Sequence, residues 1–272
     1  MNTRTSELGG TLRDDPVIVL GMHHSGTSIL AEVLHRAGVF MQANMRHSES
    51  KFFTRLNDRV ILGRPDRWAA LPLPSVDEIM SRLTAARDEI ARKALRRYVA
   101  SGYDGVGRWG FKDPRSCVTL PLLLELYPRA QLVHIVRDAD DVAASLAAGS
   151  KRGVGRVADL DHWRELRRQY IDRVRTYGAR HAQFLELTYE EFCTRPIDTT
   201  RRVLEYIHIE MPPSTVEFLD NTIYTHRIGR SRGPISSALP GGAHAIHPSS
   251  EVPANELGGR HGGCGGEIAG RD

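Results

Sequence analysis

The sequence predicts a three-layer α/β/α fold with a central parallel sheet, and three observations support that prediction. The chain has 272 residues, enough for one large α/β domain. Short apolar runs alternate with longer segments whose apolar residues recur every three or four positions. Each apolar run stops at a glycine or a polar loop before the next helical segment begins. Strands that alternate with helices in this way form a parallel sheet covered on both faces.

The elements are expected in a fixed order along the chain. Strands are expected at Pro16–Leu20, Gly107–Lys112, Gln131–Val136 and Gln183–Leu187. Helices are expected at Ser28–Ala37, Phe52–Leu62, Val76–Val99, Ser116–Tyr127, Asp140–Ala148, Asp159–Ala182, Pro196–Ile207 and Pro213–Leu219. Thr188 with Glu191 three residues later is a capping-box pattern, which predicts a further helix start after the last strand.

The predicted domain organisation has three parts. Residues 1–14 are expected to be a flexible leader and residues 15–230 a single α/β domain. Residues 231–272 are rich in Gly, Ser, Pro and His without an apolar period, so this tail is predicted to be disordered.

Composition narrows the function classes. The net charge of +4 fits an anionic ligand without requiring nucleic acid as a partner. The three cysteines, Cys117, Cys193 and Cys264, have no short pairing pattern, which favours a reducing cytoplasm over a disulfide scaffold. The polar N-terminus has no signal-peptide core, and no apolar run is long enough for a membrane span.

The loop after the first strand, Gly21 to Ser28, predicts an anion site and with it a P-loop type of fold. Gly21 and Gly26 have the glycine spacing of a Walker A loop. Backbone N–H groups in such a loop, and the helix N-terminus behind it, attract phosphate oxygens. Thr27 stands where a triphosphate-binding loop needs lysine, so a single phosphate or sulfate group fits better. The alternative is an incidental glycine turn, which the flanking strand and helix disfavour.

Two further polar groups end predicted strands. Arg137 ends the third strand, with Ser145 in the following helix, and Lys112 ends the second strand. Ligands of open α/β sheets bind beyond the carboxyl ends of strands, and a guanidinium with a hydroxyl suits a phosphate. The alternative for Arg137 is a salt bridge with Asp138 or Asp141.

These motifs together resemble the sulfotransferases that use 3′-phosphoadenosine 5′-phosphosulfate, in particular their bacterial branch. The segment from His24 to Ser28 is similar to the loop that binds the 5′-phosphosulfate, with His24 where the family has Lys or Arg. Arg137, Asp141 and Ser145 match the spacing of the 3′-phosphate motif, with Ala139 in place of its proline. The resemblance extends over about Val17–Leu219.

Weaker similarities support the same family. Gly110–Arg115 reads Gly-Phe-Lys-Asp-Pro-Arg, as in the bacterial members. The segment Leu187–Phe192 is similar to a structural Tyr-Glu-Asp-Leu stretch of the family. Near Gly229 and Gly233, basic residues faintly resemble the loop that closes over the 3′-phosphate: Arg227, Arg230 and Arg232.

The resemblance implies transfer of a sulfuryl group to a hydroxyl or amine of a small-molecule or glycan acceptor, without a metal. It implies that the 5′-phosphosulfate is held by His24, Ser25, Gly26, Thr27 and Ser28. Arg137 and Ser145 would hold the 3′-phosphate. The implied catalytic residues are His24, Lys112 and a general base, for which Glu49 is the first candidate, His47 the second and Asp58 the third.

Alternatives stay open for several of these residues. Glu49 is also compatible with a solvated loop carboxylate or a helix N-cap. Trp68, Trp109 and Trp163 suit core packing better than ligand stacking. No metal site is expected: His23 and His24 have no further ligands at a useful spacing, and the remaining candidates are scattered in the tail, at His244, His247, His261 and Cys264.

Two competing functions remain. A P-loop kinase using ATP is disfavoured by Thr27 and by the lack of a clear strand-end Asp for magnesium. A nucleotide-binding relative without catalysis is favoured by one feature, His24. The acceptor and the oligomeric state are not indicated by the sequence.

Overall fold

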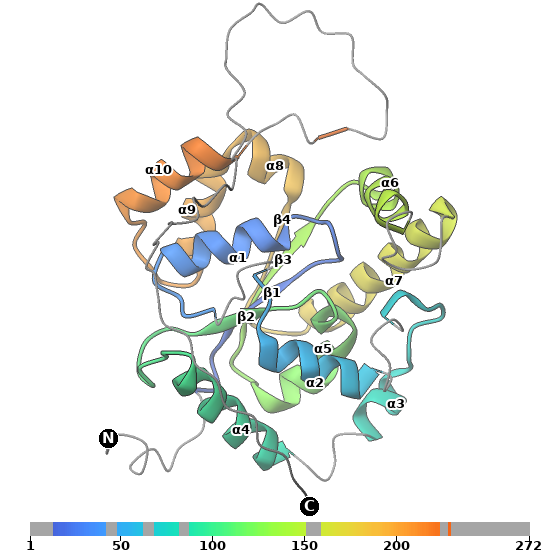
Figure 1. The fold of residues 1–272 in the computed structure, drawn as a ribbon, viewed down its shortest axis with the longest axis horizontal. Coiled ribbons are helices and arrows are strands. Elements are labelled where there is room, and N and C mark those ends of the chain that lie inside the picture. Colours follow the sequence, from blue (N-terminus) through green and yellow to red (C-terminus); the bar gives the residue numbers. More distant parts are fainter. Residues whose placement is uncertain are drawn as a thin grey trace, which may run out of the picture. The chain divides into compact units, whose positions relative to one another are not determined.

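The computed structural model describes residues 13–41, 48–61, 68–81, 87–150, 159–223 and 228–229. Four parallel strands form the sheet in the order β2-β1-β3-β4 (Figure 1). Their bounds are β1 Val17–Leu20, β2 Gly110–Lys112, β3 Gln131–Val136 and β4 Phe184–Thr188. The register pairs Val17 with both Gly110 and Gln131. The predicted α/β class and parallel sheet are therefore confirmed.

Ten helices are described around the sheet. They are α1 Thr27–Arg36, α2 Lys51–Ile61, α3 Val76–Ser81, α4 Arg87–Ala100, α5 Ser116–Leu126, α6 Ala139–Ser150, α7 Leu160–Gly178, α8 Tyr189–Thr194, α9 Pro196–Tyr206 and α10 Pro213–Thr222. The helix predicted over Val76–Val99 corresponds to α3 and α4, and residues 82–86 between them lie outside the described residues. The predicted tail, 231–272, also lies outside them, so its disorder stays a prediction.

Helix α7 ends before its predicted end at Ala182. A side chain on Gly178 would place its Cβ 2.7 Å from the ring of Phe184, so the end of α7 and the start of β4 pack closely. His181, in the turn between them, lies with its Nε2 2.7 Å from the carbonyl oxygen of Ala130. The chain turns here because β4 must pair with β3, a long-range constraint that helix periodicity does not encode.

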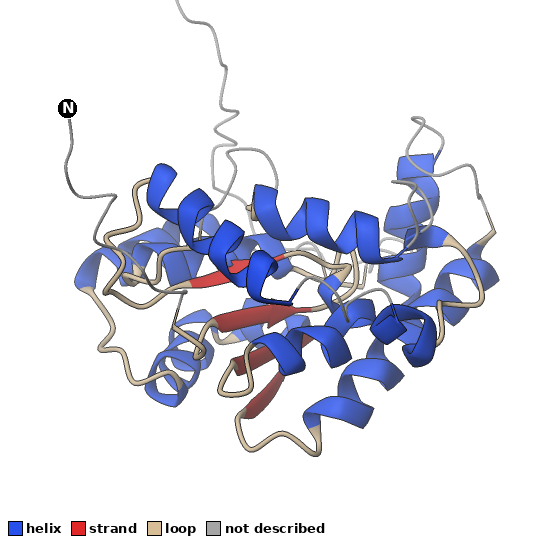
Figure 2. Cartoon of the chain, turned by 90° about the horizontal axis from the view of Figure 1, so that it is seen from below, coloured by secondary structure: helices blue, strands red, loops and turns tan. Residues whose placement is uncertain are grey.

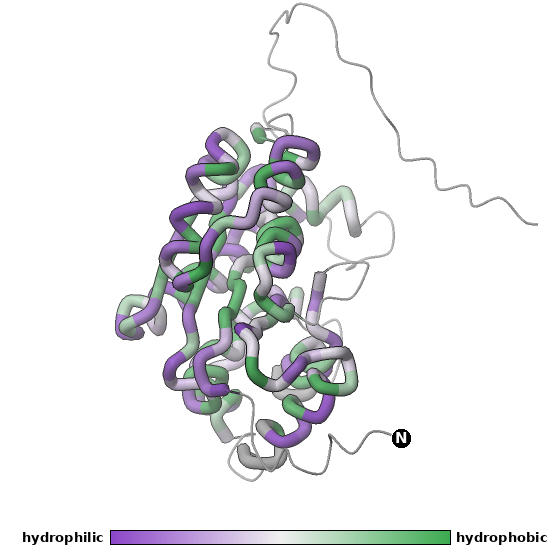
Figure 3. Tube along the Cα trace, turned by 90° about the vertical axis from the view of Figure 1, so that its left-hand side faces the viewer, coloured by the Kyte–Doolittle hydropathy of each residue, from purple (hydrophilic) through white to green (hydrophobic). Residues whose placement is uncertain are grey.

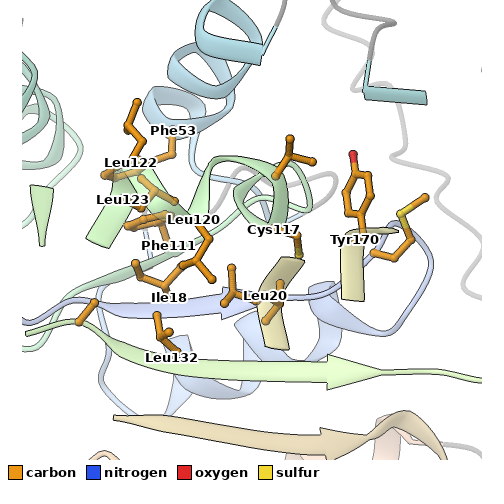
Figure 4. Packing of buried hydrophobic residues seen from close by; sticks show 14 of the residues in the cluster. Ile18, Leu20, Phe53, Phe111, Cys117, Leu120, Leu122, Leu123, Leu132 and Tyr170 are labelled. Carbon is orange, nitrogen blue, oxygen red and sulfur yellow. The ribbon is translucent and has the colours of Figure 1, made fainter. Parts of the chain in front are cut away.

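The strands separate two apolar cores, as their period of two requires. Ile18 and Leu20 face one core, which also contains buried residues of α2 to α7. Val17 and Val19 face the other core, formed with α1, α8, α9 and α10. Figure 2 shows the strands with helices on both sides, and Figure 4 shows the first core around β1 and α5. The predicted three layers are thus present.

Aromatic residues fill much of the first core. The rings of Phe53 and Phe111 stack with centroids 3.5 Å apart. Trp109 and Trp163 are buried, which confirms core packing as the role of both, whereas Trp68 is only part-buried. Along the helices, apolar and polar residues alternate in colour in Figure 3, as expected for helices with one buried face.

All strands run the same way, so their carboxyl ends lie at one edge of the sheet. The residues that follow the strands there are Gly21, Asp113, Arg137 and Tyr189. This edge therefore gathers segments that are distant in sequence, and it is where a ligand of an open parallel sheet binds.

Candidate functional site

The loop between β1 and α1 is a tight turn with two residues in the left-handed region. The N–H of Ser25 donates to the carbonyl of Met22 at 3.1 Å, and φ is +66° at His24 and +93° at Gly26. A Cβ on Gly26 would lie 2.4 Å from the ring of Tyr189, so only glycine fits. Gly26 is also the N-cap of α1 and offers no side chain. The N-terminus of α1 therefore has no side-chain cap from Gly26, and its partial positive charge favours an anion there.

The base of this loop is held by neighbouring elements. The N–H of Gly21 donates to the Sγ of Cys117 in α5 at 3.1 Å. A Cβ on Gly21 would come within 2.7 Å of the carbonyl oxygen of Ile135 in β3. Burial raises the pKa of the Cys117 thiol to about 12, so this sulfur is a thiol rather than a thiolate. The loop is thus pinned at its start by α5 and packed against β3.

Arg137 and Ser145 meet this loop. Arg137 is buried; its Nη1 donates to the carbonyl of His24 at 3.1 Å, and its Nη2 donates to Asp141 at 3.3 Å. The Nδ1 of His24 lies 2.6 Å from the Oγ of Ser145. The two sequence motifs therefore form one polar site. The salt bridge with Asp141, the alternative considered for Arg137, is present as well.

Three side chains from other elements hold Arg137 in place. Its guanidinium lies 4.5 Å from the ring centroid of Tyr189, the first residue of α8. Its carbonyl accepts hydrogen bonds from the Nε, at 2.8 Å, and the Nη2 of Arg167 in α7. Its partner Asp141 also accepts from the N–H of Gly229 at 2.8 Å. The late basic residues near Gly229, which are Arg227, Arg230 and Arg232, lie outside the described residues.

A buried charged cluster lies at the end of β2. The Nζ of Lys112 is 3.3 Å from Glu49, and Arg115 is 3.6 Å from the other oxygen of that carboxylate. Arg115 also pairs with Asp113 and Asp58, at 2.8 and 2.7 Å. Burial lowers the pKa of Lys112, and Glu49 and Asp113 partly offset this. Burial also acts to lower the pKa of Arg115, but its acidic partners raise it above the ordinary value.

The three candidates for the general base are placed differently. Glu49 lies in the charged cluster, with both of its oxygens facing cations. Burial raises the pKa of Asp58, against the opposing effect of Arg115. His47 lies outside the described residues. The structure thus brings Glu49 to Lys112, as the family resemblance implies for two residues of one site.

The remaining predicted residues belong to the loop and the first turn of α1. Ser25 and Thr27 are buried, whereas Ser28 and His24 are exposed. Their positions are set by the loop turn and by the start of α1.

Sequence reasoning missed Tyr189, Arg115 and Arg167 as parts of the site. Tyr189 directly follows a strand and Arg115 follows another after two residues, a position that signals the ligand edge. Arg167 lies in the middle of α7, where no local pattern marks it.

The described residues contain neither a metal-binding cluster nor a membrane-spanning helix. No three side chains of His, Cys, Asp or Glu in these segments come together as a metal site would require. No helix in the same segments combines the length and apolarity needed to cross a membrane.

Solved structures share this fold at low sequence identity. The sulfotransferase domain from the olefin synthase of Synechococcus PCC 7002 matches with a TM-score of 0.52 and 18% identity, covering 86% of this chain and 92% of its own. The sulfotransferase domain from the curacin biosynthetic pathway gives 0.51 and 13%, covering 76% and 77%. A sulfotransferase from Mycobacterium tuberculosis H37Rv gives 0.51 and 15%, covering 80% and 74%. These matches establish a common fold.

The sequence itself establishes the family. No curated protein sequence matches the chain. Residues 16–213, however, match the profile of the Sulfotransferase family, and this range contains the loop, the charged cluster and the Arg137 motif. The chain therefore belongs to the sulfotransferase family, whose members are transferases.

Proposed function

We propose that this protein transfers the sulfuryl group of 3′-phosphoadenosine 5′-phosphosulfate to a hydroxyl or amine on a small-molecule or glycan acceptor. One observation carries the proposal: the loop after β1 and the Arg137–Ser145 motif meet through the 2.6 Å contact between His24 and Ser145. A donor with a phosphosulfate at one end and a second phosphate nearby needs two adjacent anion sites. The family membership supports the same chemistry.

The residues present fit such a donor. The first turn of α1 has no side-chain cap, which suits an anion at its N-terminus. In the proposal, the loop from His24 to Ser28 binds the 5′-phosphosulfate. Arg137 and Ser145 bind the 3′-phosphate, with Arg137 held by Tyr189 and Arg167. The bound donor would supply the activated sulfuryl group.

Lys112 is proposed to stabilise charge on the sulfuryl oxygens. Its ammonium is almost fully buried at the carboxyl end of β2. A fixed cation in a site of low dielectric constant stabilises developing negative charge more strongly than water does. The contact with Glu49 at 3.3 Å fixes the position of Nζ.

Glu49 is proposed to accept the proton of the acceptor's hydroxyl or amine. Its carboxylate lies 3.3 Å from the Nζ of Lys112 and 3.6 Å from Arg115, which hold it at the carboxyl end of β2. We expect Glu49→Gln to lower kcat by roughly 10²- to 10⁴-fold, the usual contribution of a general base. Glu210→Gln, an exposed glutamate after α9, is the matched control and is expected to keep full turnover. Unchanged turnover of Glu49→Gln would exclude this role.

Calorimetry without magnesium tests the donor site. We expect 3′-phosphoadenosine 5′-phosphate to bind more tightly than ATP, because Thr27 replaces the lysine of a triphosphate loop. Arg137→Ala is expected to weaken bisphosphate binding by about 10- to 100-fold, the loss of a charge-assisted contact. Arg129→Ala serves as the control, since Arg129 pairs with Asp14 beside the start of β3, at the opposite edge of the sheet.

The same measurement separates the competing functions. Equal or tighter binding of ATP would contradict the sulfotransferase proposal and favour a kinase. Tight bisphosphate binding without turnover of any acceptor would favour a non-catalytic relative, which His24 makes a specific alternative. A reducing compartment such as the cytoplasm is part of the proposal and suits the free thiols Cys117 and Cys193.

A further inference from the structure

Glu49, the proposed proton acceptor, lies outside the helices and strands of the fold. The residue before it, Ser48, has a φ of +51°, in the left-handed region that serine rarely adopts. Such a backbone conformation costs energy and persists only where neighbouring contacts hold it in place. The position of the Glu49 carboxylate next to Lys112 therefore depends on contacts that fix the backbone around it.

Ser50, the next residue, makes the first of these contacts. Its N–H donates to the carbonyl of Lys112 at 3.2 Å, so the backbone of Ser50 pairs with the end of β2. Its own carbonyl accepts from the N–H of Thr54 at 2.9 Å, which starts α2. This pairing places Glu49 where its carboxylate reaches the Nζ of Lys112 at 3.3 Å.

The hydroxyl of Tyr98 in α4 fixes the same junction from a third element. It donates to the carbonyl of Gly110 in β2 at 3.0 Å, and it lies 3.2 Å from the Oγ of Ser50. Tyr98 and Ser50 are fully buried. Burial raises the pKa of Tyr98 well above its usual range, so the hydroxyl keeps its hydrogen at pH 7. One hydroxyl therefore joins the strand that ends in Lys112 to the residue that follows Glu49.

The ring of Tyr98 is packed by contacts that do not involve its hydroxyl. It meets the ring of Trp109 edge-on, with centroids 5.1 Å apart, and that of Phe53 at 6.0 Å, within the first core. Removal of the hydroxyl alone leaves these aromatic contacts in place. Tyr98→Phe therefore tests the hydrogen-bonded junction without opening a cavity in the core.

We propose that Tyr98 is a positioning residue: through Ser50 it holds the backbone of Glu49, so that the carboxylate stays beside Lys112 in the geometry that proton acceptance needs. The inference rests on the proposed function for the role of Glu49. In the described part of the chain, the Tyr98 hydroxyl contacts Ser50 and Gly110 and no charged side chain, so it acts through Glu49 rather than on a substrate. A displacement of about 1 Å in such a site is enough to lower turnover by roughly 10²-fold.

Urea unfolding tests the link without any substrate, with Tyr98→Phe and Glu49→Gln measured singly and together. If the hydroxyl holds Glu49 against its cations, Glu49→Gln changes the unfolding equilibrium constant less in the Tyr98→Phe background, by a factor of about two or more. Tyr103→Phe is the matched control, because the Tyr103 hydroxyl also donates to a glycine carbonyl, that of Gly107, at 2.7 Å. Its effect is expected to add to that of Glu49→Gln.

Catalysis gives the second measurement, with 3′-phosphoadenosine 5′-phosphosulfate as donor and water as acceptor. The water oxygen bonds to sulfur, one of its protons passes to Glu49, and the bond from sulfur to the phosphate oxygen breaks, so sulfate release measures turnover. We expect Tyr98→Phe to lower kcat by about 10- to 100-fold, with an unchanged Kd for 3′-phosphoadenosine 5′-phosphate. In the Glu49→Gln background the same substitution should not lower kcat further, whereas a general loss of structure would lower it in both backgrounds.

The proposal is wrong if Tyr98→Phe and Glu49→Gln have additive effects on unfolding, if Tyr98→Phe keeps full kcat, or if its loss of kcat is the same in the Glu49→Gln background. If Tyr98→Phe does not fold, Ser50→Ala removes the other hydroxyl of the contact and is measured in the same way. Its control is Ser75→Ala, which removes the hydroxyl that accepts from the N–H of Glu78 at the start of α3. If Glu49→Gln itself keeps full turnover, the proposed role of Glu49 fails, and the unfolding measurements decide separately whether Tyr98 holds this residue.

Discussion

Gly26 is the residue at which backbone conformation and packing are both restricted. Its φ of +93° favours glycine, and a Cβ there would meet the Tyr189 ring at 2.4 Å. Gly102 has a similar φ of +100°, but no atom lies within 4 Å of its would-be Cβ. A substitution at Gly102 therefore tests backbone strain alone, whereas one at Gly26 tests backbone strain together with steric overlap.

We expect Gly102→Ala to lower the free energy of unfolding by about 1 kcal/mol, the cost of a left-handed alanine. Gly26→Ala adds overpacking against Tyr189, so it is expected to cost roughly 1–3 kcal/mol more. Urea unfolding of both variants measures the difference. Equal costs would show that the ring of Tyr189 moves aside freely.

At the residue scale, the sequence indicated candidate site residues but not the residues that they contact in the fold. His24, Lys112, Arg137 and Ser145 were proposed as site residues from their motifs and from the family resemblance. The 2.6 Å contact between His24 and Ser145 joins residues 121 positions apart. Contacts of this kind depend on how α6 packs beside the loop, and local spacing carries no information about that.

At the scale of elements, α8 links helix capping to the site. Thr188 is its N-cap and accepts a hydrogen bond from the N–H of Glu191 at 3.1 Å, as the capping-box pattern predicted. The next residue, Tyr189, lies against both Gly26 and Arg137. The cap therefore sets the direction of a side chain that supports both anion motifs.

Thr188→Ala is expected to destabilise the protein by about 0.5–2 kcal/mol, the usual cost of losing an N-cap. It should also weaken bisphosphate binding, because Tyr189 loses its fixed orientation under Arg137. Thr222→Ala, at the end of α10, is the control and should change stability by less than about 0.5 kcal/mol. Thermal unfolding measures the change in stability, and calorimetry measures the change in affinity. An unchanged affinity would show that the Thr188 cap does not influence the binding site.

The predicted ends of the strands agree with the structure, whereas the predicted end of one helix, α7, does not. All four strands were predicted within a few residues, and β1 and β3 are the two fully buried, mostly apolar runs among them. The end of α7 was predicted too late: the helix ends at Gly178, a residue that favours helix ends, and not at Ala182. The stop comes from Phe184, which belongs to the next strand.

At the scale of the whole molecule, a polar network around Glu186 connects three elements of the fold. Glu186 in β4 contacts His134 in β3 at 3.0 Å and Arg175 in α7 at 2.8 Å. Its hydrogen bonds with His134 and Arg175 lower the pKa of Glu186 from 4.5 to about 2. Burial lowers the pKa of His134 below 6.5. Both shifts mean that the unfolded chain binds more protons in acid.

The free energy of unfolding is therefore expected to decrease as the pH is lowered. Below pH 6.5 the decrease comes from protonation of His134, and between about pH 4.5 and 2 from protonation of Glu186. Glu186→Gln should lower the free energy of unfolding by on the order of 1 kcal/mol at pH 7 and by much less near pH 2. The figure takes into account that Glu186 is partly exposed to solvent. Urea midpoints at both pH values test this. Glu205→Gln, an exposed glutamate in α9, is the control. A cost of Glu186→Gln that does not depend on pH would contradict the assignment.

The whole fold was predictable because its layers follow from one pattern, apolar runs alternating with amphipathic segments. The alternation of side chains along β1 was enough to predict an apolar core on each face of the sheet. The contacts of Tyr189, Arg115 and Arg167 with the candidate site were not predictable, because they join segments that come together only after folding.

The Cys117 thiol, which accepts the hydrogen bond of the Gly21 N–H, can also report how often the loop opens. Cys117 and Cys193 are both free and buried, one beneath the anion loop and the other in α8. A thiol reagent can modify either one only after its surroundings open, so the labelling rate of each cysteine reports the opening of its own element. Protection of Cys117 by an anion in the loop, with Cys193 labelled at an unchanged rate, would distinguish local closure of the loop from stabilisation of the entire domain.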